Sequence, residues 1–192
     1  MQALDILKKY WGYNTFRLKQ EEVINSVLKS KDTLALLPTA GGKSICFQVP
    51  ALMKDGICLV ISPLISLMED QIKYLKSKGI KSVSISSSMN NNDIKTALTN
   101  CLYGGIKFLY LSPEKLRDQS VKEKINQMNV NLIAVDEAHC ISNWGHNFRP
   151  SYRLISEIRY TKKNIPILAL TATANKSVVC LLYTSPSPRD RG

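Results

Sequence analysis

The sequence Thr33-Leu-Ala-Leu-Leu-Pro-Thr-Ala-Gly-Gly-Lys-Ser44 decides the fold. Its apolar first half, Thr33–Leu37, predicts a buried strand, and the segment that begins at Lys43 predicts a helix. A glycine-rich loop between a strand and a helix is typical of a phosphate-binding loop, because its backbone N–H groups surround phosphate at the helix N-terminus. The residues expected to bind the nucleotide phosphates are Thr39, Ala40, Gly41, Gly42, Lys43 and Ser44.

Two side chains of this loop have predicted roles. Lys43 would reach the β- and γ-phosphates of ATP, and the Ser44 hydroxyl would bind Mg²⁺. The strict loop pattern requires glycine six residues before the lysine, where this chain has Leu37. The alternative is a glycine turn with an incidental lysine, but the order strand, loop, helix favours the nucleotide site.

Short apolar runs alternate with amphipathic segments along the rest of the chain. This alternation predicts an α/β domain, a parallel sheet with helices on both faces, whose ligands bind at the carboxyl ends of the strands. The expected strands are Thr33–Leu37, Ile57–Ile61, Ser82–Ile85, Lys107–Leu111, Leu132–Val135 and Ile167–Leu170. The expected helices are Lys19–Ser30, Lys43–Met53, Leu64–Lys78, Asp93–Leu102, Ser120–Met128 and Ser151–Arg159.

Two adjacent carboxylates, Asp136 and Glu137, end the predicted strand Leu132–Val135. An enzyme with a phosphate loop needs a carboxylate at a strand end to hold Mg²⁺, and a base or orienting group for the attacking water. We therefore expect Asp136 to bind Mg²⁺ and Glu137 to act on water, with Lys43 as the third catalytic residue. Adjacent carboxylates also commonly begin helices, where the helix dipole stabilises them.

The composition favours a globular protein with a polyanionic partner. The chain has 192 residues, of which 44% are hydrophobic, and its 26 Lys and Arg exceed its 15 Asp and Glu by 11 charges. Such a surplus suits nucleic acid, although many lysine-rich surfaces are only solvated. No apolar run is long enough for a membrane span, no secretory signal is visible, and five scattered cysteines fit reduced thiols. We expect a cytoplasmic protein, associated with the nucleoid if it is bacterial.

Together these segments resemble superfamily 2 helicases, specifically RecQ, over nearly all of residues 4–179. The resemblance implies a RecA-like domain that binds ATP and Mg²⁺. In the segment Gly12–Gln20, it implies that Gln20 pairs with the adenine edge and that Tyr13 and Arg17 flank the ring. Ser62–Gln71 resembles helicase motif Ia, which lies near the DNA strand, and Tyr110–Leu116 resembles motif Ib. Leu170–Ala174 resembles motif III, which couples the nucleotide state to DNA binding.

The most diagnostic stretch is Ala138–Pro150, which resembles the aromatic-rich loop that RecQ enzymes place after their acidic motif. Trp144 and Phe148 offer stacking faces for unpaired bases, and Arg149 offers a cation for phosphate. Trp144, Phe148 and Arg149, together with His146, form the expected nucleic-acid site. The alternative is that the two aromatic side chains are ordinary core residues. A structural zinc at His139, Cys140 and His146 would need a fourth ligand, and none is near. Where the family usually has Gly, Gln and Asp, this chain has Ala40, Asn143 and Asn147.

The chain is expected to divide at residue 179. Residues 1–179 would form the first RecA-like lobe, with its C-terminus incomplete and its partner lobe missing in cis. Residues 180–192 do not continue the pattern, and Cys180–Asp190 resemble the translation of a transposase adapter used in sequencing libraries. The alternative is a native linker rich in serine and proline. We expect this fragment alone to be weak or inactive in unwinding.

The resemblance implies an ATP-dependent 3′–5′ DNA helicase that acts on single-stranded and forked DNA in repair and recombination. A rival interpretation is a DEAD-box RNA helicase. Against it stand His139 instead of Asp, Thr171-Ala-Thr instead of Ser-Ala-Thr, and the aromatic loop. A rival from another class is a non-catalytic nucleic-acid-binding module, which the intact Lys43, Asp136 and Glu137 oppose.

Overall fold

The computed structural model describes residues 1–38, 42–141 and 150–173. Six strands form one sheet in these ranges: β1 Thr33–Leu36, β2 Ile57–Ile61, β3 Ser82–Ile85, β4 Phe108–Leu111, β5 Val130–Val135 and β6 Ile167–Thr171. Their order is β1-β6-β5-β2-β4-β3, and every neighbouring pair is parallel. This arrangement confirms the predicted parallel α/β sheet and brings all carboxyl ends to one edge.

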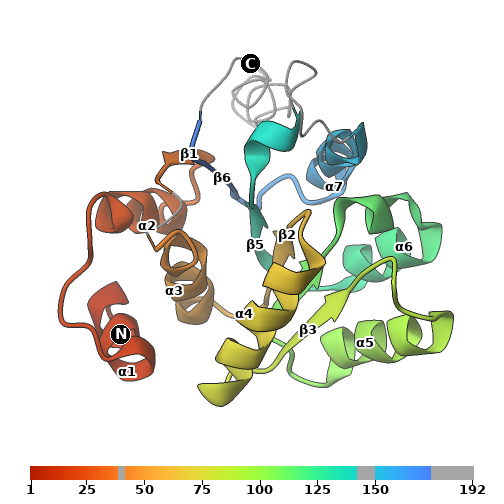
Figure 1. Cartoon of the computed structure of the whole chain (residues 1–192), viewed down its shortest axis with the longest axis horizontal. Coiled ribbons are helices and arrows are strands. Elements are labelled where there is room, and N and C mark those ends of the chain that lie inside the picture. The colour runs from red at the N-terminus through yellow and green to blue at the C-terminus, as the bar shows by residue number, and fades with distance from the viewer. Residues whose placement is uncertain (39–41, 142–149, 174–192) are drawn as a thin grey trace.

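Helices cover both faces of this sheet (Figure 1). The α-helices are α1 Ala3–Trp11, α2 Gln20–Leu28, α3 Ile45–Met53, α4 Ile65–Ser77, α5 Asn91–Tyr103, α6 Gln119–Gln127 and α7 Ile155–Thr161. Three short 3₁₀ helices join them: η1 Pro113–Arg117, η2 Ala138–Ile141 and η3 Pro150–Leu154. No helix in the described ranges is both long and apolar enough to cross a membrane.

Two hydrophobic layers hold the helices to the sheet. On one face α2, α3 and α4 pack through side chains such as Val23, Phe47 and Met68. On the other face α5, α6 and α7 pack through residues such as Leu98 and Ile155. The central strands β2 and β5 are buried along their whole length, as expected for strands covered on both sides. The sheet is therefore a rigid support for groups at its carboxyl edge.

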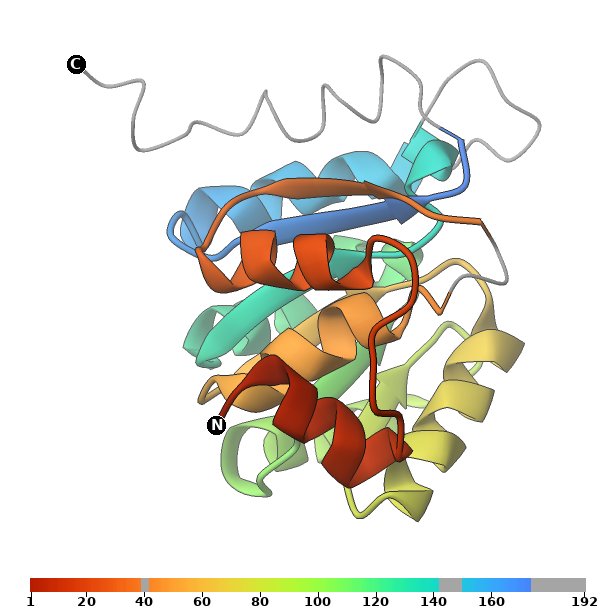
Figure 2. The same ribbon diagram turned by 90° about the vertical axis from the view of Figure 1, so that its left-hand side faces the viewer.

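Helix α1 was absent from the predicted elements. Its apolar residues Ile6, Leu7, Tyr10 and Trp11 have the same spacing that identified α2. Ile6 and Leu7 are buried in a cluster with Ile45 and Val49 of α3 and Ile24 of α2, and Figure 2 shows α1 on the outer side of α3. The N-terminal helix thus supports α3, the helix that follows the phosphate loop.

The remaining predicted boundaries agree with the structure to within about two residues, apart from one helix. The predicted helix Ser151–Arg159 is wrong in its first part, where the chain forms the 3₁₀ helix η3 and only then α7. Tertiary contacts fix this tighter turn, because the Tyr152 hydroxyl donates to the Asp136 carbonyl at 3.0 Å and Ser151 donates to Glu114 at 3.3 Å.

Candidate nucleotide site

The predicted nucleotide-binding segments meet at the carboxyl edge of the sheet. The phosphate loop follows β1, the acidic pair follows β5, and β6 lies between these two strands. Leu36 pairs with Thr171 in the sheet, and the Leu37 amide donates to the Thr171 carbonyl at 3.1 Å. Residues far apart in the sequence therefore surround one small volume, as the strand order requires.

The described part of the phosphate loop comprises Pro38 and the residues from Gly42 onward, and Thr39, Ala40 and Gly41 lie outside the described residues. Gly42 has φ +67°, a conformation that glycine adopts without steric cost. A Cβ at this position would lie 2.5 Å from Gln20 Nε2. Glycine is therefore required here for its backbone conformation and for the close approach of Gln20.

Lys43 meets both carboxylates of the acidic pair. Its Nζ lies 3.3 Å from Glu137 Oε1 and 3.8 Å from Asp136 Oδ1. Asp136 is only 7% exposed, and this burial raises the pKa of its carboxyl above the usual range, while the Lys43 ammonium opposes the rise. One cation thus partly neutralises two carboxylates in a poorly hydrated site.

Glu137 adopts an unusual backbone conformation, with φ +51°. Non-glycine residues rarely occupy this left-handed region, and such strain is concentrated at functional sites. The Glu137 amide donates to Asp136 Oδ1 at 2.9 Å, which fixes the Asp136 carboxylate relative to the turn. The turn directs both carboxylates towards Lys43 instead of letting β5 continue.

His139 connects the acidic pair to the end of β6. Its Nδ1 lies 3.4 Å from Glu137 Oε2 and 3.3 Å from Thr171 Oγ1. The Thr171 hydroxyl donates to the Thr173 carbonyl at 2.8 Å, so its oxygen is left to accept. Since Glu137 Oε2 and Thr171 Oγ1 can both accept, this geometry favours the tautomer with the proton on Nδ1. A continuous polar chain therefore runs from Lys43 through Glu137 and His139 to Thr171.

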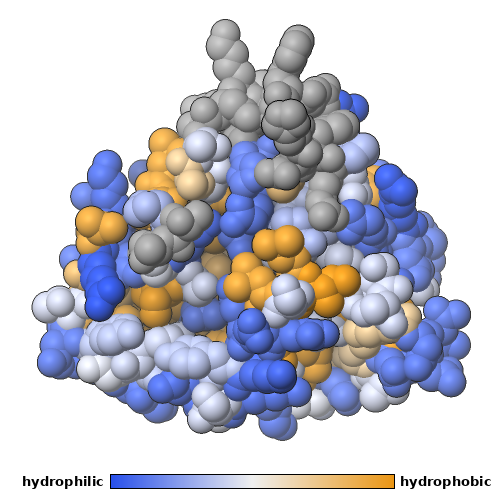
Figure 3. Space-filling model, in the orientation of Figure 1, coloured by the Kyte–Doolittle hydropathy of each residue, from blue (hydrophilic) through white to orange (hydrophobic). Residues whose placement is uncertain are grey.

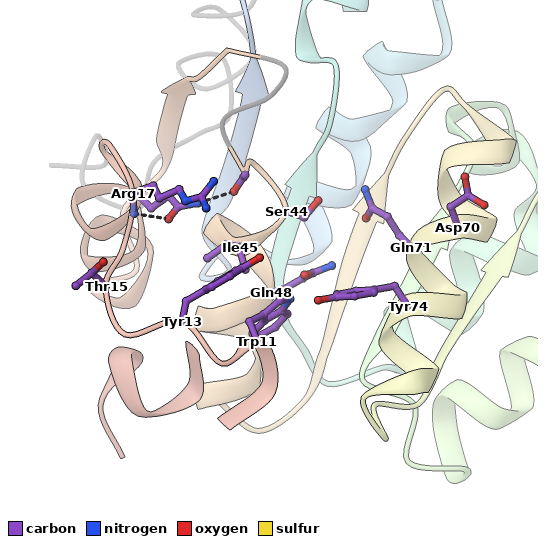
Figure 4. Close-up of a pocket in the computed structure, with 12 residues that line it drawn as sticks. Trp11, Tyr13, Thr15, Arg17, Ser44, Ile45, Gln48, Asp70, Gln71 and Tyr74 are labelled. Atoms are coloured by element: carbon purple, nitrogen blue, oxygen red, sulfur yellow. Dashed lines mark hydrogen bonds between the residues drawn. The ribbon is translucent and has the colours of Figure 1, made fainter. Parts of the chain in front are cut away.

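The predicted adenine-binding residues lie together beside the phosphate loop. The Arg17 guanidinium carbon lies 5.7 Å from the centre of the Tyr13 ring. Gln20 is 4% exposed, and its amide accepts from the Arg17 amide at 2.8 Å and donates to the Gly42 carbonyl at 3.0 Å, as the dashed lines in Figure 4 show. Gln20 thus joins the base-binding segment to the phosphate loop.

These residues form one wall of a cavity of about 360 Å³. Figure 4 shows side chains from α3 and α4 around the remainder. The lining residues are Trp11, Tyr13, Thr15, Arg17, Gln20, Gly42, Ser44, Ile45, Gln48, Asp70, Gln71 and Tyr74. Seven of them were not predicted as site residues, namely Thr15 in the base-binding segment and six residues on helices: Trp11, Ile45, Gln48, Asp70, Gln71 and Tyr74. The positions of these six on helix faces resembled ordinary packing, and only the fold brings them to the nucleotide site.

The predicted nucleic-acid residues Trp144, His146, Phe148 and Arg149 lie outside the described residues, as do Asn143 and Asn147. The segments that flank them are described. η2 directly follows the acidic pair, and η3 is anchored by the hydrogen bond of Tyr152 to the Asp136 carbonyl. The described segments on either side of residues 142–149 therefore adjoin the nucleotide site.

The donor set fits a nucleotide with its cation. A lysine, two carboxylates and the loop that carries Ser44 converge at a helix N-terminus, which is the arrangement that phosphate and Mg²⁺ require. A model of the DEAD/DEAH box helicase family matches residues 17–181. The chain belongs to this helicase family.

Individual relatives place this helicase close to RecQ. It is 46% identical over 173 residues to the ATP-dependent DNA helicase RecQ of Haemophilus influenzae, covering 90% of this chain and 28% of that protein. It is also 46% identical over 177 residues to a putative ATP-dependent RNA helicase of Acanthamoeba polyphaga mimivirus, covering 90% of this chain and 32% of that protein. The chain spans about a third of the length of the curated relatives it matches.

The helicase also matches solved structures. The DUF1998 helicase MrfA bound to DNA and AMPPNP matches with a TM-score of 0.75 and 17% identity, covering 97% of this chain and 28% of that chain. This likeness establishes the fold, which is the RecA-like helicase domain that the sequence predicted.

Proposed function

We propose that this chain is the first ATP-binding lobe of a RecQ-like DNA helicase, which couples ATP hydrolysis to 3′–5′ movement along single-stranded DNA. The complete protein would unwind forked DNA during repair and recombination. It would do so in the cell compartment that holds the chromosome. The supporting observation is the convergence of Lys43 with Asp136 and Glu137 across two strands of the sheet. The second lobe, supplied in cis, would complete the nucleotide cleft.

The residues of this lobe would divide the work of hydrolysis. ATP with Mg²⁺ supplies the phosphoryl group that passes to water, together with a cation that neutralises its charge. Lys43 would leave the carboxylates and contact the phosphates, while Asp136 and Ser44 hold the cation. Glu137 would orient the attacking water and accept its proton, held in place by His139.

The base would be recognised on the wall formed by Tyr13 and Arg17. Because these groups already lie 5.7 Å apart, they would separate slightly to admit a flat ring between them. The Gln20 amide would then read the adenine edge. Since Gln20 also contacts the Gly42 carbonyl, adenine recognition would be transmitted directly to the phosphate loop.

Single-stranded DNA would bind at residues 142–149. Trp144 and Phe148 would stack on bases, and Arg149 with His146 would contact the backbone. The support is the position of the flanking helices η2 and η3, both fixed to the acidic pair. A change in the nucleotide site would thus reach the bases over a short path.

RNA is the second candidate substrate, because one relative at 46% identity carries the name of a putative RNA helicase. ATP hydrolysis by the full-length protein with single-stranded DNA or RNA of the same sequence separates the two. We expect DNA to stimulate turnover more strongly. Stimulation by RNA alone would overturn the DNA assignment, and absence of any hydrolysis would leave only a nucleic-acid-binding role.

A further inference from the structure

A buried polar chain links α3 to α4 at the floor of the nucleotide cavity. The Gln48 side-chain amide donates to the Tyr110 hydroxyl at 3.4 Å, and this hydroxyl donates to Gln71 Oε1 at 2.7 Å. Gln48 is 2% exposed and Tyr110 is 1% exposed. One hydroxyl therefore joins three elements, namely α3, β4 and α4.

Stability alone does not explain why this chain of hydrogen-bonded polar side chains is buried. Burial raises the pKa of the Tyr110 hydroxyl far above its usual range, so the group stays protonated and able to donate at neutral pH. Replacing a buried hydrogen-bonded pair with apolar groups of the same shape is often neutral or stabilising. A polar chain at this position therefore favours a role in the relative placement of the helices.

The α3 end of the chain is coupled to the phosphate loop. The Gln48 backbone N–H donates to the Ser44 carbonyl at 2.9 Å, so Gln48 lies one helical turn after the loop. A shift of Lys43 and Ser44 onto phosphate would move the Gln48 side chain with them. Its contact with Tyr110 is long for a hydrogen bond, whereas the contact of Tyr110 with Gln71 is short. The hydrogen bond that reaches α3 is thus weaker than the one that reaches α4.

The other end of the chain leads to surface at the same edge of the sheet. Tyr110 lies near the end of β4, which runs into η1, and Gln71 is on α4. Leu64, immediately before α4, is 48% exposed, and Figure 3 shows an apolar patch over the N-terminal turn of that helix. The first turn of α4 is therefore available to a partner.

We propose that the Tyr110 hydroxyl is a positioning group that couples nucleotide binding on α3 to nucleic-acid binding along α4, whose first part belongs to the segment Ser62–Gln71 that resembles helicase motif Ia. This inference rests on the proposed function. When Lys43 and Ser44 shift onto phosphate, the hydrogen bond from Gln48 to Tyr110 shortens, and the stronger hydrogen bond from Tyr110 to Gln71 passes the shift to α4. Without the hydroxyl, nucleotide and nucleic acid would each still bind, but the binding of one would no longer change the affinity for the other.

The test is Tyr110→Phe in the full-length protein, which removes one oxygen and retains the ring. We expect the factor by which single-stranded DNA stimulates ATP turnover to fall about 3- to 30-fold, the range for residues that carry coupling between sites. The increase in DNA affinity caused by a non-hydrolysable ATP analogue should fall by a similar factor, while the affinity for DNA without nucleotide stays unchanged. Gln71→Leu should reduce stimulation equally, and the double variant no further.

Asn131→Ala is the matched control. The Asn131 side chain also makes buried hydrogen bonds to α3, but at the end far from the phosphate loop, to the carbonyls of Ala51 at 3.1 Å and Lys54 at 3.2 Å. We expect it to lower the melting temperature without lowering stimulation. Unchanged stimulation in Tyr110→Phe, or an equal loss in Asn131→Ala, would overturn the inference alone. If neither DNA nor RNA stimulated ATP turnover by the full-length protein without substitutions, the proposed function would be overturned as well.

Discussion

Lys43 Nζ lies 3.3 Å from Glu137 Oε1, although 94 positions separate the two residues in the chain. Glu137 can hold the ammonium in this position only because β5 ends in a left-handed turn at that residue. The two groups to which we assign phosphate contact and water activation thus neutralise one another in this structure.

We predict that Lys43→Ala and Glu137→Gln both abolish ATP turnover in the full-length protein, with different effects on binding. Loss of the ammonium removes a phosphate contact, so Lys43→Ala should also weaken nucleotide affinity, whereas Glu137→Gln should retain it. Turnover and equilibrium nucleotide binding measure the two effects. Lys122→Ala breaks an exposed ion pair with Glu157 and is the control that should remain active. Near-normal ATP turnover in either variant would contradict the catalytic role proposed for the substituted residue.

Gly42→Ala should weaken nucleotide binding through the displacement of Gln20. The new Cβ would meet Gln20 Nε2, and the residue would also be strained at φ +67°. Gly79→Ala separates these two effects, because Gly79 has φ +76° but nothing within 4 Å of the position that a new Cβ would take. Both variants should lose about 1–2 kcal/mol of stability, because alanine is strained in the left-handed conformation. Only Gly42→Ala should lose affinity for a fluorescent ATP analogue, and equal affinities would show that Gln20 plays no part.

Arg159→Ala should be among the most destabilising single substitutions in this domain. The Arg159 guanidinium is buried, its Nη2 lies 2.5 Å from Asp32 Oδ2, and Asp32 Oδ1 accepts from the Ile167 amide at 2.9 Å. The pair therefore joins α7 to the starts of β1 and β6. Because the Asp32 side chain is 23% exposed and can be hydrated, the main loss is that of charge-assisted hydrogen bonds, about 1.5–3 kcal/mol each. Chemical denaturation measures this loss, and a value below that of the exposed Lys122→Ala would contradict the role.

The sequence predicted most of the fold because buried parallel strands are nearly continuous apolar runs, as β2 and β5 are. It also predicted Lys43, Asp136 and Glu137, since these side chains follow strand ends in the expected motifs. The sequence could not predict their mutual pairing, because the order of β1, β6 and β5 is a property of the sheet. The link between Gln48, Tyr110 and Gln71 was missed for the same reason, because their hydrogen bonds join α3, β4 and α4, which only the fold brings together.

Trp144→Ala should uncouple DNA from hydrolysis. Stacking of an aromatic side chain on a base contributes roughly 1–3 kcal/mol, so basal ATP turnover should survive while stimulation by DNA falls. If Trp144 were instead a core residue, its loss would cost roughly 3–5 kcal/mol of stability. A thermal melt beside the hydrolysis assay distinguishes these results. A large loss of stability with intact stimulation would contradict the proposed role in stacking.

A polypeptide of residues 1–192, prepared alone, should not unwind DNA. In two-lobed helicases the nucleotide lies in the cleft between the lobes, and the second lobe supplies an arginine that stabilises the transferred phosphate. This polypeptide spans about a third of the length of its relatives, and its last arginines, Arg189 and Arg191, lie in residues 180–192, which we expect not to belong to the helicase sequence. The absence of an arginine finger typically lowers turnover by a factor of about 10³–10⁵.

The same polypeptide should retain weak nucleotide binding, because Lys43 and the amides after Gly42 belong to this lobe. Binding of a fluorescent ATP analogue and a strand-separation assay on forked DNA test both statements. Lys43→Ala should abolish the weak binding, which shows that the signal comes from the phosphate loop. Without a second lobe there is no surface that moves relative to the first, so hydrolysis has no means of displacing a strand. Robust ATP-dependent strand separation by residues 1–192 would therefore refute the two-lobe mechanism for this protein.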